Sequence, residues 1–240
     1  MAEDHTHIVS SFDEELTRLN NIISQMGGLA ESQLISSIRS IVKRDSELAE
    51  KVILSDQRID VLEQEVQDFA VRLLALRQPM ADDLRQVVTA LKLSNDLERI
   101  GDLAKNIAKR AQVLNQIPPI RPVQAIPNMA KLAQEIIKDV LDAYIESDAE
   151  KAHRVWERDQ EVDDMYNSLF RELLTYMMED PRNITASTHL LFIAKNIERI
   201  GDHATNIAET IYYRIKGEDL PGIDRPKNDA ANFAVVEPNE

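Results

Sequence analysis

A pentapeptide with two carboxylates occurs twice in this sequence. Glu-Arg-Ile-Gly-Asp spans residues 98–102 and again residues 198–202, within a duplicated and almost wholly helical pattern. Helix packing requires only apolar residues at the right spacing, so it does not require a Glu and an Asp four positions apart in both copies. The repeat therefore indicates one acidic site that was built twice.

A further acidic pair precedes each copy of the motif. Asp56 and Asp60 lie four residues apart before the first copy, and Asp159 and Asp163 do so before the second. If these segments are antiparallel neighbours of the motif helices, the pairs can meet, and four converging carboxylates would repel one another unless a cation intervened. Oxygen ligands suit hard or intermediate ions, and Mg, Mn, Fe, Zn and Ca all remain open. The predicted metal ligands are Asp56, Asp60, Glu98 and Asp102 in the first half, and Asp159, Asp163, Glu198 and Asp202 in the second.

The motif carboxylates point away from the main apolar face of their helix. At about 100° per residue, Glu98, Asp102 and Asn106 form a polar stripe separate from the apolar face around Leu97. A metal cluster held by them would therefore lie at the protein surface. The alternative is a solvated acidic face without metal, because acidic pairs are frequent in a chain with 42 Asp and Glu residues.

Neighbouring residues are expected to support these ligands or a partner. Arg99 and Arg199 can each pair with the Asp three residues on, or can contact a phosphate or an acidic partner. Asn106 and Asn206 are either outer hydrogen-bonding residues or ordinary surface residues. The glycine in each motif costs a helix about 1 kcal/mol relative to Ala, which predicts close approach of a neighbour or a bound ion.

Composition places the chain in the all-α class. Of its 240 residues, 43% are hydrophobic but only 5% are aromatic, which favours helix over sheet. The formal charge of −14 would repel a phosphate backbone, so we expect no nucleic-acid binding. Because the chain has no cysteine, any metal must be held by oxygen or imidazole.

No segment of the sequence predicts a membrane span or an export signal. No window approaches 18 uninterrupted apolar residues, and the N-terminus is acidic rather than basic. We therefore expect a cytoplasmic protein that does not insert directly into a membrane.

Apolar residues at spacings of three and four predict two tandem three-helix bundles, related by internal duplication and containing six long helices. Prolines between the halves and after the last helix mark the boundaries, because proline cannot continue a helix. The predicted divisions are a first bundle at 1–116, a proline-rich linker at 117–127, a second bundle at 128–216 and a flexible C-terminal tail at 217–240.

Capping and breaking residues mark the ends of the individual helices. Asp45 or Ser46 is expected to cap the second helix, and a similar restart is expected near Asp148. Pro79 and Pro181 are expected to break the chain between the last two helices of each half.

The sequence carries no recognisable enzyme motif. It has no Gly-rich phosphate loop, no G-x-S-x-G elbow and no H-E-x-x-H helix, and Gly101 and Gly201 stand where a ferritin-type site would need His. We therefore expect no enzymatic activity. The main rival is a metal-dependent phosphohydrolase, because clustered ions can activate water and clamp a phosphate. No Lys or His placed beside the acids is evident in support of that rival.

Three sequence features together resemble the PhoU family of bacterial phosphate-uptake regulators. They are the doubled pentapeptide, the Asp-Gln-x-x-Asp segments before it, and Arg-Gln-Pro-Met-Ala-Asp-Asp-Leu-Arg at residues 77–85. The resemblance extends from about residue 12 to about residue 215. It implies tandem three-helix bundles with surface metal clusters on the acidic motifs, and a non-enzymatic, usually dimeric negative regulator.

The same resemblance implies partners and a location. Such a regulator would link the ATPase subunit of the phosphate-specific ABC transporter to the PhoR sensor histidine kinase, recruited through the transporter to the inner face of the membrane. It would keep the phosphate-starvation response off when phosphate is plentiful. The second copy departs from the first where Asn196 replaces Asp96 and where the segment at 180–182 is shorter. The two sites are therefore expected to differ in affinity or in number of ions.

Overall fold

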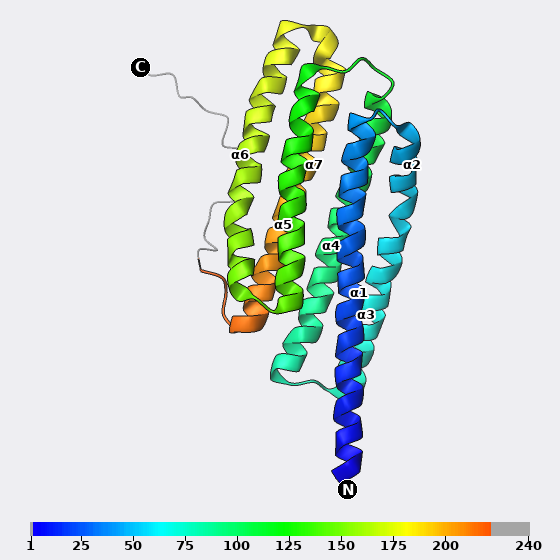
Figure 1. The fold of residues 1–240 in the computed structure, drawn as a ribbon, viewed down its shortest axis with the longest axis vertical. Coiled ribbons are helices and arrows are strands. Elements are labelled where there is room, and N and C mark those ends of the chain that lie inside the picture. The colour runs from blue at the N-terminus through cyan, green and yellow to red at the C-terminus, as the bar shows by residue number, and fades with distance from the viewer. Residues whose placement is uncertain (1, 222–240) are drawn as a thin grey trace.

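The structure, a computed structural model, describes residues 2–221, with side chains from residue 12 onward. Within that range it contains seven α-helices, two short 3-10 helices and no strand (Figure 1). None of these helices combines the length and the apolar character needed to cross a membrane. The predicted all-α class and the two tandem three-helix bundles are confirmed.

The first bundle contains α1, α2, α3 and α4, with bounds Ala2–Val42, Ser46–Ser55, Gln57–Arg77 and Ala81–Leu114. Together α2 and α3 make the second helix of the bundle, which is interrupted at Asp56. Asp56 itself keeps helical φ and ψ angles of −56° and −39°. The sequence pattern did not predict this interruption, which places a polar side chain at the junction.

The second bundle contains α5 (Ile126–Glu146), α6 (Ala149–Glu179) and α7 (Ile184–Lys216). The 3-10 helix η1 (Arg121–Ala125) leads into α5, and η2 (Pro181–Asn183) joins α6 to α7. Each bundle therefore ends in a long helix that carries one copy of the pentapeptide.

The turn between the first two helices has the same capping residue and backbone geometry in both bundles. Asp45 and Asp148 each accept a hydrogen bond at 2.9 Å from the backbone N–H three residues on, as N-cap residues do. Arg44 and Ser147, directly before them, both adopt left-handed φ angles, of 54° and 53°. The predicted caps are confirmed, and the duplication extends to backbone geometry.

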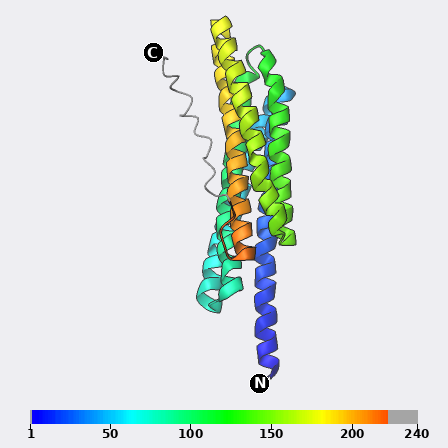
Figure 2. The ribbon, with the colours of Figure 1, turned by 90° about the vertical axis from the view of Figure 1, so that its left-hand side faces the viewer.

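The two bundles lie side by side rather than end to end (Figures 1 and 2). Contacts between them run from α1 to α5 and from α4 to α7. Buried apolar side chains from all seven α-helices form one continuous cluster. Because both repeats contribute to this cluster, they share one core.

Two segments differ from the expected linker and tail. The predicted linker contains η1, and α5 begins at Ile126, inside the linker boundary. In the predicted tail, Leu220 is only 2% exposed and packs with Ala149 and Tyr212, because the chain reverses at Gly217, which has a left-handed φ of 74°. The rest of the predicted tail, residues 222–240, lies outside the described residues.

Candidate metal centre

The acidic residues of the first bundle meet where its second helix is interrupted. Asp56 lies at the junction of α2 and α3 and is 3% exposed, and Asp60 follows one turn later with its side chain exposed. Glu98 and Asp102 lie on α4, which packs against α2 and α3. Burial, together with the charge of Asp102, raises the pKa of Glu98 to about 7, and Asp60 acts in the same direction. The two acidic pairs of this bundle therefore lie close enough to repel one another.

A lysine joins the two elements of this cluster. Lys105 Nζ contacts Asp56 Oδ2 and lies 2.6 Å from Asp102 Oδ1. Burial alone would lower the pKa of Lys105, but its bonds to the two carboxylates outweigh burial and raise it. Burial nevertheless raises the pKa of Asp56, although Lys105 opposes this. The single positive charge of Lys105 therefore offsets the negative charges of Asp56 and Asp102 only in part.

Arg99 lies along the outer edge of the same cluster. Its Nε atom is 3.2 Å from Glu98 Oε2 and its Nη1 atom is 3.7 Å from Asp102 Oδ2, with half of the side chain exposed. The contact with Glu98 is not a hydrogen bond, and buried Glu98 Oε2 has no hydrogen-bond partner within the described chain. A buried carboxylate oxygen without a partner is costly, and a cation would remove that cost.

The second bundle brings together its own acids on α6 and α7. Glu198 is 4% exposed and Asp163 is 9% exposed. Burial raises the pKa of Glu198; the charges of Asp202 and Asp163 also raise it, whereas Lys195 lowers it. Lys195 Nζ lies 2.6 Å from Glu198 Oε1, and buried Glu198 Oε2 has no hydrogen-bond partner among the described residues. In both clusters, therefore, one buried oxygen of the motif glutamate has no hydrogen-bond partner among the described residues.

The two motif glycines face side chains of the neighbouring helix. A Cβ atom on Gly101 would lie 2.8 Å from Ile59 Cδ1 and 3.4 Å from Asp56 Oδ1. On Gly201 it would lie 2.5 Å from Asp159 Oδ1. The close approach predicted from the glycines is therefore present, and its source is the upstream acidic segment of each bundle.

Asn206 takes part in a contact between the bundles rather than in its own cluster. Its Nδ2 atom lies 3.5 Å from Oδ1 of Asp96 on α4, and the same oxygen lies 2.9 Å from His203 Nδ1. Asn106 and Arg199 are exposed on α4 and α7. Asn206 therefore faces α4, and the role of the two asparagines beside the metal ligands stays a prediction.

The clusters partly fit a metal ion. The fitting features are the oxygen-only donors, the two partnerless glutamate oxygens and the raised pKa values. Among the described residues, however, no three acidic or histidine side chains are already arranged to hold an ion. The positive charge beside the acids comes from Lys105 and Lys195. Metal binding would therefore require these side chains to rearrange.

Sequence reasoning missed both lysines. Each stands three residues from a motif acid, Lys105 after Asp102 and Lys195 before Glu198, which is the spacing of an ordinary surface ion pair. That spacing was the available signal. The expectation that no Lys lies beside the acids was wrong.

Comparisons with known proteins agree on one family. The family model described as the PhoU domain matches residues 23–111 and 126–211. A "Phosphate-specific transport system accessory protein PhoU homolog" from Caulobacter vibrioides is 55% identical, covering 93% of this chain and 97% of the relative. A protein with the same description from Rhizobium meliloti is 53% identical, covering 94% and 95%.

Two solved structures share the fold. The crystal structure of PhoU from Pseudomonas aeruginosa matches with a TM-score of 0.84 and 38% identity, covering 86% of this chain and all of that one. The phosphate transport system regulatory protein PhoU from Streptococcus pneumoniae matches with a TM-score of 0.80 and 31% identity, covering 87% and 99%. The likeness therefore extends over both bundles.

Proposed function

This chain belongs to the PhoU family, and we propose that it is a negative regulator of phosphate uptake and of the phosphate-starvation response. The observation that carries the proposal is the match over nearly the whole chain to relatives described as accessory proteins of the phosphate-specific transport system. Identity above 50% over both repeats makes a shared role the simplest account. No catalytic motif points elsewhere.

In this proposal the protein is a cytoplasmic adaptor, and its two bundles present binding surfaces to partners and catalyse no reaction. It binds the ATPase subunit of a phosphate ABC transporter and a PhoR-type sensor histidine kinase, and it is a homodimer. An adaptor can regulate only by binding one state of its partner better than another. A shared core that holds both bundles in one arrangement supports such selective binding.

We further propose that the two carboxylate clusters bind metal ions. Asp56, Asp60, Glu98 and Asp102 would hold the first, and Asp159, Asp163, Glu198 and Asp202 the second. A bound cation would give the buried Oε2 atoms of Glu98 and Glu198 the partner that they lack among the described residues. In each cluster, carboxylates from two elements would hold the ion, and Lys105 or Lys195 would move aside. The bound ion would thereby join α4 to the α2–α3 junction in the first bundle and α7 to α6 in the second.

A metal-free helical scaffold is the second candidate. It is favoured by the ion pairs of Lys105 with Asp56 and Asp102, which already cross-link the first cluster. A phosphohydrolase receives no such support from the two clefts between the bundles within the described part of the chain, because these carboxylates do not line them.

Complementation tests the regulatory role. In a bacterium that lacks its own such regulator, the wild-type chain is expected to restore repression of a phosphate-starvation reporter, and co-purification is expected to recover the transporter ATPase subunit and the kinase. A chain with Glu98→Gln and Glu198→Gln tests whether metal ligands matter for this. Failure of the folded wild-type chain to repress the reporter or to capture either partner would contradict the proposed function.

A further inference from the structure

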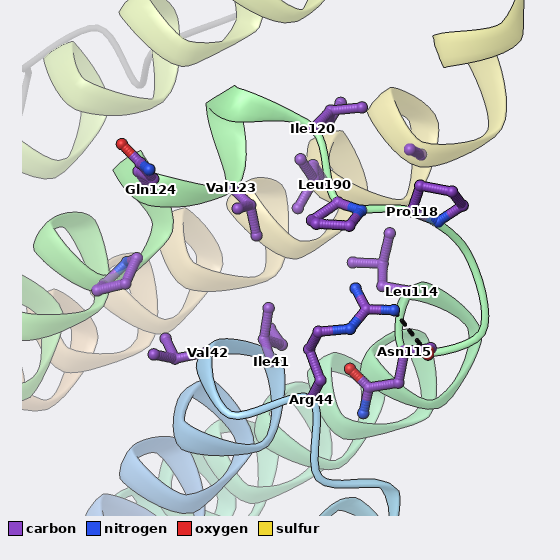
Figure 3. A pocket seen from close by; sticks show the side chains of 13 residues that line it. Ile41, Val42, Arg44, Leu114, Asn115, Pro118, Ile120, Val123, Gln124 and Leu190 are labelled. Carbon is purple, nitrogen blue, oxygen red and sulfur yellow. Dashed lines mark hydrogen bonds between the residues drawn. The ribbon is translucent and has the colours of Figure 1, made fainter.

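Two cavities lie at the boundary between the bundles, near opposite ends of α4 and α7. The apolar cleft, about 410 Å³, lies by the ends of α1 and α4 and the start of α7. Figure 3 shows Ile41, Leu114, Val123 and Leu190 directed into it. The polar cleft, about 490 Å³, lies by the start of α4 and the ends of α5 and α7.

These clefts occupy equivalent places in the duplicated fold. The two family matches begin 103 residues apart, at 23 and 126, and end 100 residues apart, at 111 and 211. With these offsets, Ile41 corresponds to Tyr144 and Leu114 corresponds to Arg214, and each pair lines the respective cleft. One cavity was therefore built twice and then diverged in chemistry.

The chemical difference between the two clefts is greatest at the position of Arg214. At the equivalent position, Leu114 is 8% exposed and belongs to the apolar core. A leucine side chain is therefore sufficient to fill this position in the core. An arginine in a partly buried position costs desolvation free energy that a leucine does not, so packing alone does not account for it.

Arg214 lacks a counter-charge within the part of the chain that the structure describes. Its Nη2 atom donates to Ser147 Oγ at 2.7 Å and to the carbonyl oxygen of Tyr144 at 3.4 Å, and its guanidinium lies 5.0 Å from the centre of the Tyr144 ring. All of these partners are neutral, and burial lowers the pKa of Arg214. Although the chain has a formal charge of −14, the partly buried Arg214 guanidinium has no carboxylate partner among the described residues. It can therefore pair with an anion from solution.

The rest of the polar cleft offers hydrogen-bonding groups. Its lining includes Asn20, Asn21, Ser24 and Gln86, and the Tyr144 hydroxyl donates to Asn20 Oδ1 at 2.7 Å, which fixes that amide. One carboxylate, Asp82, also belongs to the lining, but its side chain is 86% exposed and it is paired with the guanidinium of Arg85. The charge facing the cleft is therefore positive on balance.

We propose that the polar cleft binds a small phosphorylated anion, with the Arg214 guanidinium as its counter-charge and the surrounding amides and hydroxyls as hydrogen-bond partners. Guanidinium groups recognise phosphate through paired N–H groups, and the volume also admits a small polar body attached to the phosphate. The ligand is inorganic phosphate or a small phosphate monoester. Binding of an anion is inferred from the Arg214 guanidinium and the hydrogen-bonding groups of the cleft. The choice of phosphate as that anion rests on the proposed function.

Calorimetric titration of the full chain tests this, with inorganic phosphate in one experiment and ribose 5-phosphate in another. Each is run on protein as purified and after chelator treatment, so that phosphate held by a metal is distinguished from phosphate held by Arg214. Arg214→Leu, which copies Leu114, is expected to weaken binding at least about tenfold without lowering the melting temperature of the ligand-free protein. Gln86→Ala, which copies Ala186 in the other cleft, is expected to weaken binding less.

Arg44→Gln is the matched control, because it removes the guanidinium of the apolar cleft. Arg44 is exposed and donates to the carbonyl oxygens of Asn115 and Ile117 (Figure 3 draws the first bond). Phosphate binding by this variant is expected to equal that of the wild type. Stronger binding of ribose 5-phosphate than of inorganic phosphate would identify a monoester as the ligand, and the reverse would identify phosphate itself.

The proposal is overturned if the wild-type chain binds neither compound at millimolar concentration, or if both Arg214→Leu and Gln86→Ala bind as tightly as the wild type. If Arg214→Leu fails to fold, Gln86→Ala and the charge-preserving Arg214→Lys decide the matter. Because anion binding is measured on the purified chain, a negative titration would not contradict the proposed regulatory function. Failure to capture a partner would likewise not contradict anion binding in the polar cleft.

Discussion

The two carboxylate clusters share one pentapeptide but are neutralised differently. In the first, Lys105 of α4 contacts Asp56 at the α2–α3 junction as well as Asp102 on its own helix. In the second, Lys195 contacts Glu198 on its own helix. Thr205 stands where the first copy has Lys105. The pentapeptide therefore places the acids, and the residues around it decide whether an internal cation ties two elements together.

This difference has a consequence for metal binding. An ion at the first cluster has to displace an ammonium group that two acids hold, whereas at the second it competes with a one-acid pair whose lysine is more exposed. Both clusters leave a buried glutamate oxygen without a hydrogen bond in the described chain. We therefore expect the second cluster to bind metal more tightly than the first.

The largest effect is expected from removing the lysines. Without metal, Lys105→Met leaves Asp56 buried without its cation, so the free energy of unfolding is expected to fall by about 2–3 kcal/mol. Lys195→Met is expected to cost about 1 kcal/mol or less, because that lysine is over a third exposed and solvent screens the pair. Urea denaturation in the presence of a chelator measures both. Equal losses in the two variants would contradict the comparison.

The motif glycines are expected to differ by a smaller amount. Gly101→Ala forces its Cβ against the fully buried Ile59, and overpacking is expected to destabilise the protein by about 1–2 kcal/mol. Gly201→Ala meets chiefly the end of the Asp159 side chain, which can rotate away, and the helix gains about 1 kcal/mol from the alanine. Its stability should therefore match or exceed that of the wild type.

Metal titration extends the glycine comparison. Moving Asp159 should weaken metal binding at the second cluster of the Gly201→Ala variant while leaving the first cluster unchanged. A Gly201→Ala protein that is as destabilised as Gly101→Ala would show that Asp159 is held rigidly, against this interpretation.

The smallest effect concerns pH. Glu98 has a pKa of about 7 in the folded chain, above the ordinary value of 4.5. Between these values the folded chain keeps a proton that the unfolded chain releases, so stability is lost as pH rises through this window. In chelator, Glu98→Gln should be more stable than the wild type by about 1 kcal/mol at pH 8 and equal to it near pH 4. Thermal melts at both pH values measure this, and a destabilised Glu98→Gln at pH 8 would contradict it.

Much of the fold was predictable because it depends on local sequence. Apolar spacing around Leu97 and Ile197 placed the helices, Asp45 and Asp148 marked their restarts, and the repeated pentapeptide located the acids. These signals involve residues within a few turns of one another, and a single sequence contains them in full.

The remaining features depend on how distant segments pack. The interruption at Asp56 and its contact with Lys105 require α2, α3 and α4 to be placed in space. The contact of Asp96 with His203 requires the two bundles to lie side by side. No spacing rule within one helix contains these contacts between elements, whereas the pairs of Lys105 with Asp102 and of Lys195 with Glu198 do follow a spacing of three residues.

Anomalous diffraction from crystals of the full chain soaked with Mn²⁺ tests the central claim most directly. The account predicts peaks at both clusters, in contact with Glu98 and Glu198, with Lys105 Nζ and Lys195 Nζ moved off the acids, and stronger occupancy at the second cluster. Crystals without peaks at either cluster, in which both lysines keep their contacts with Asp102 and Glu198, would contradict it and would leave the metal-free scaffold.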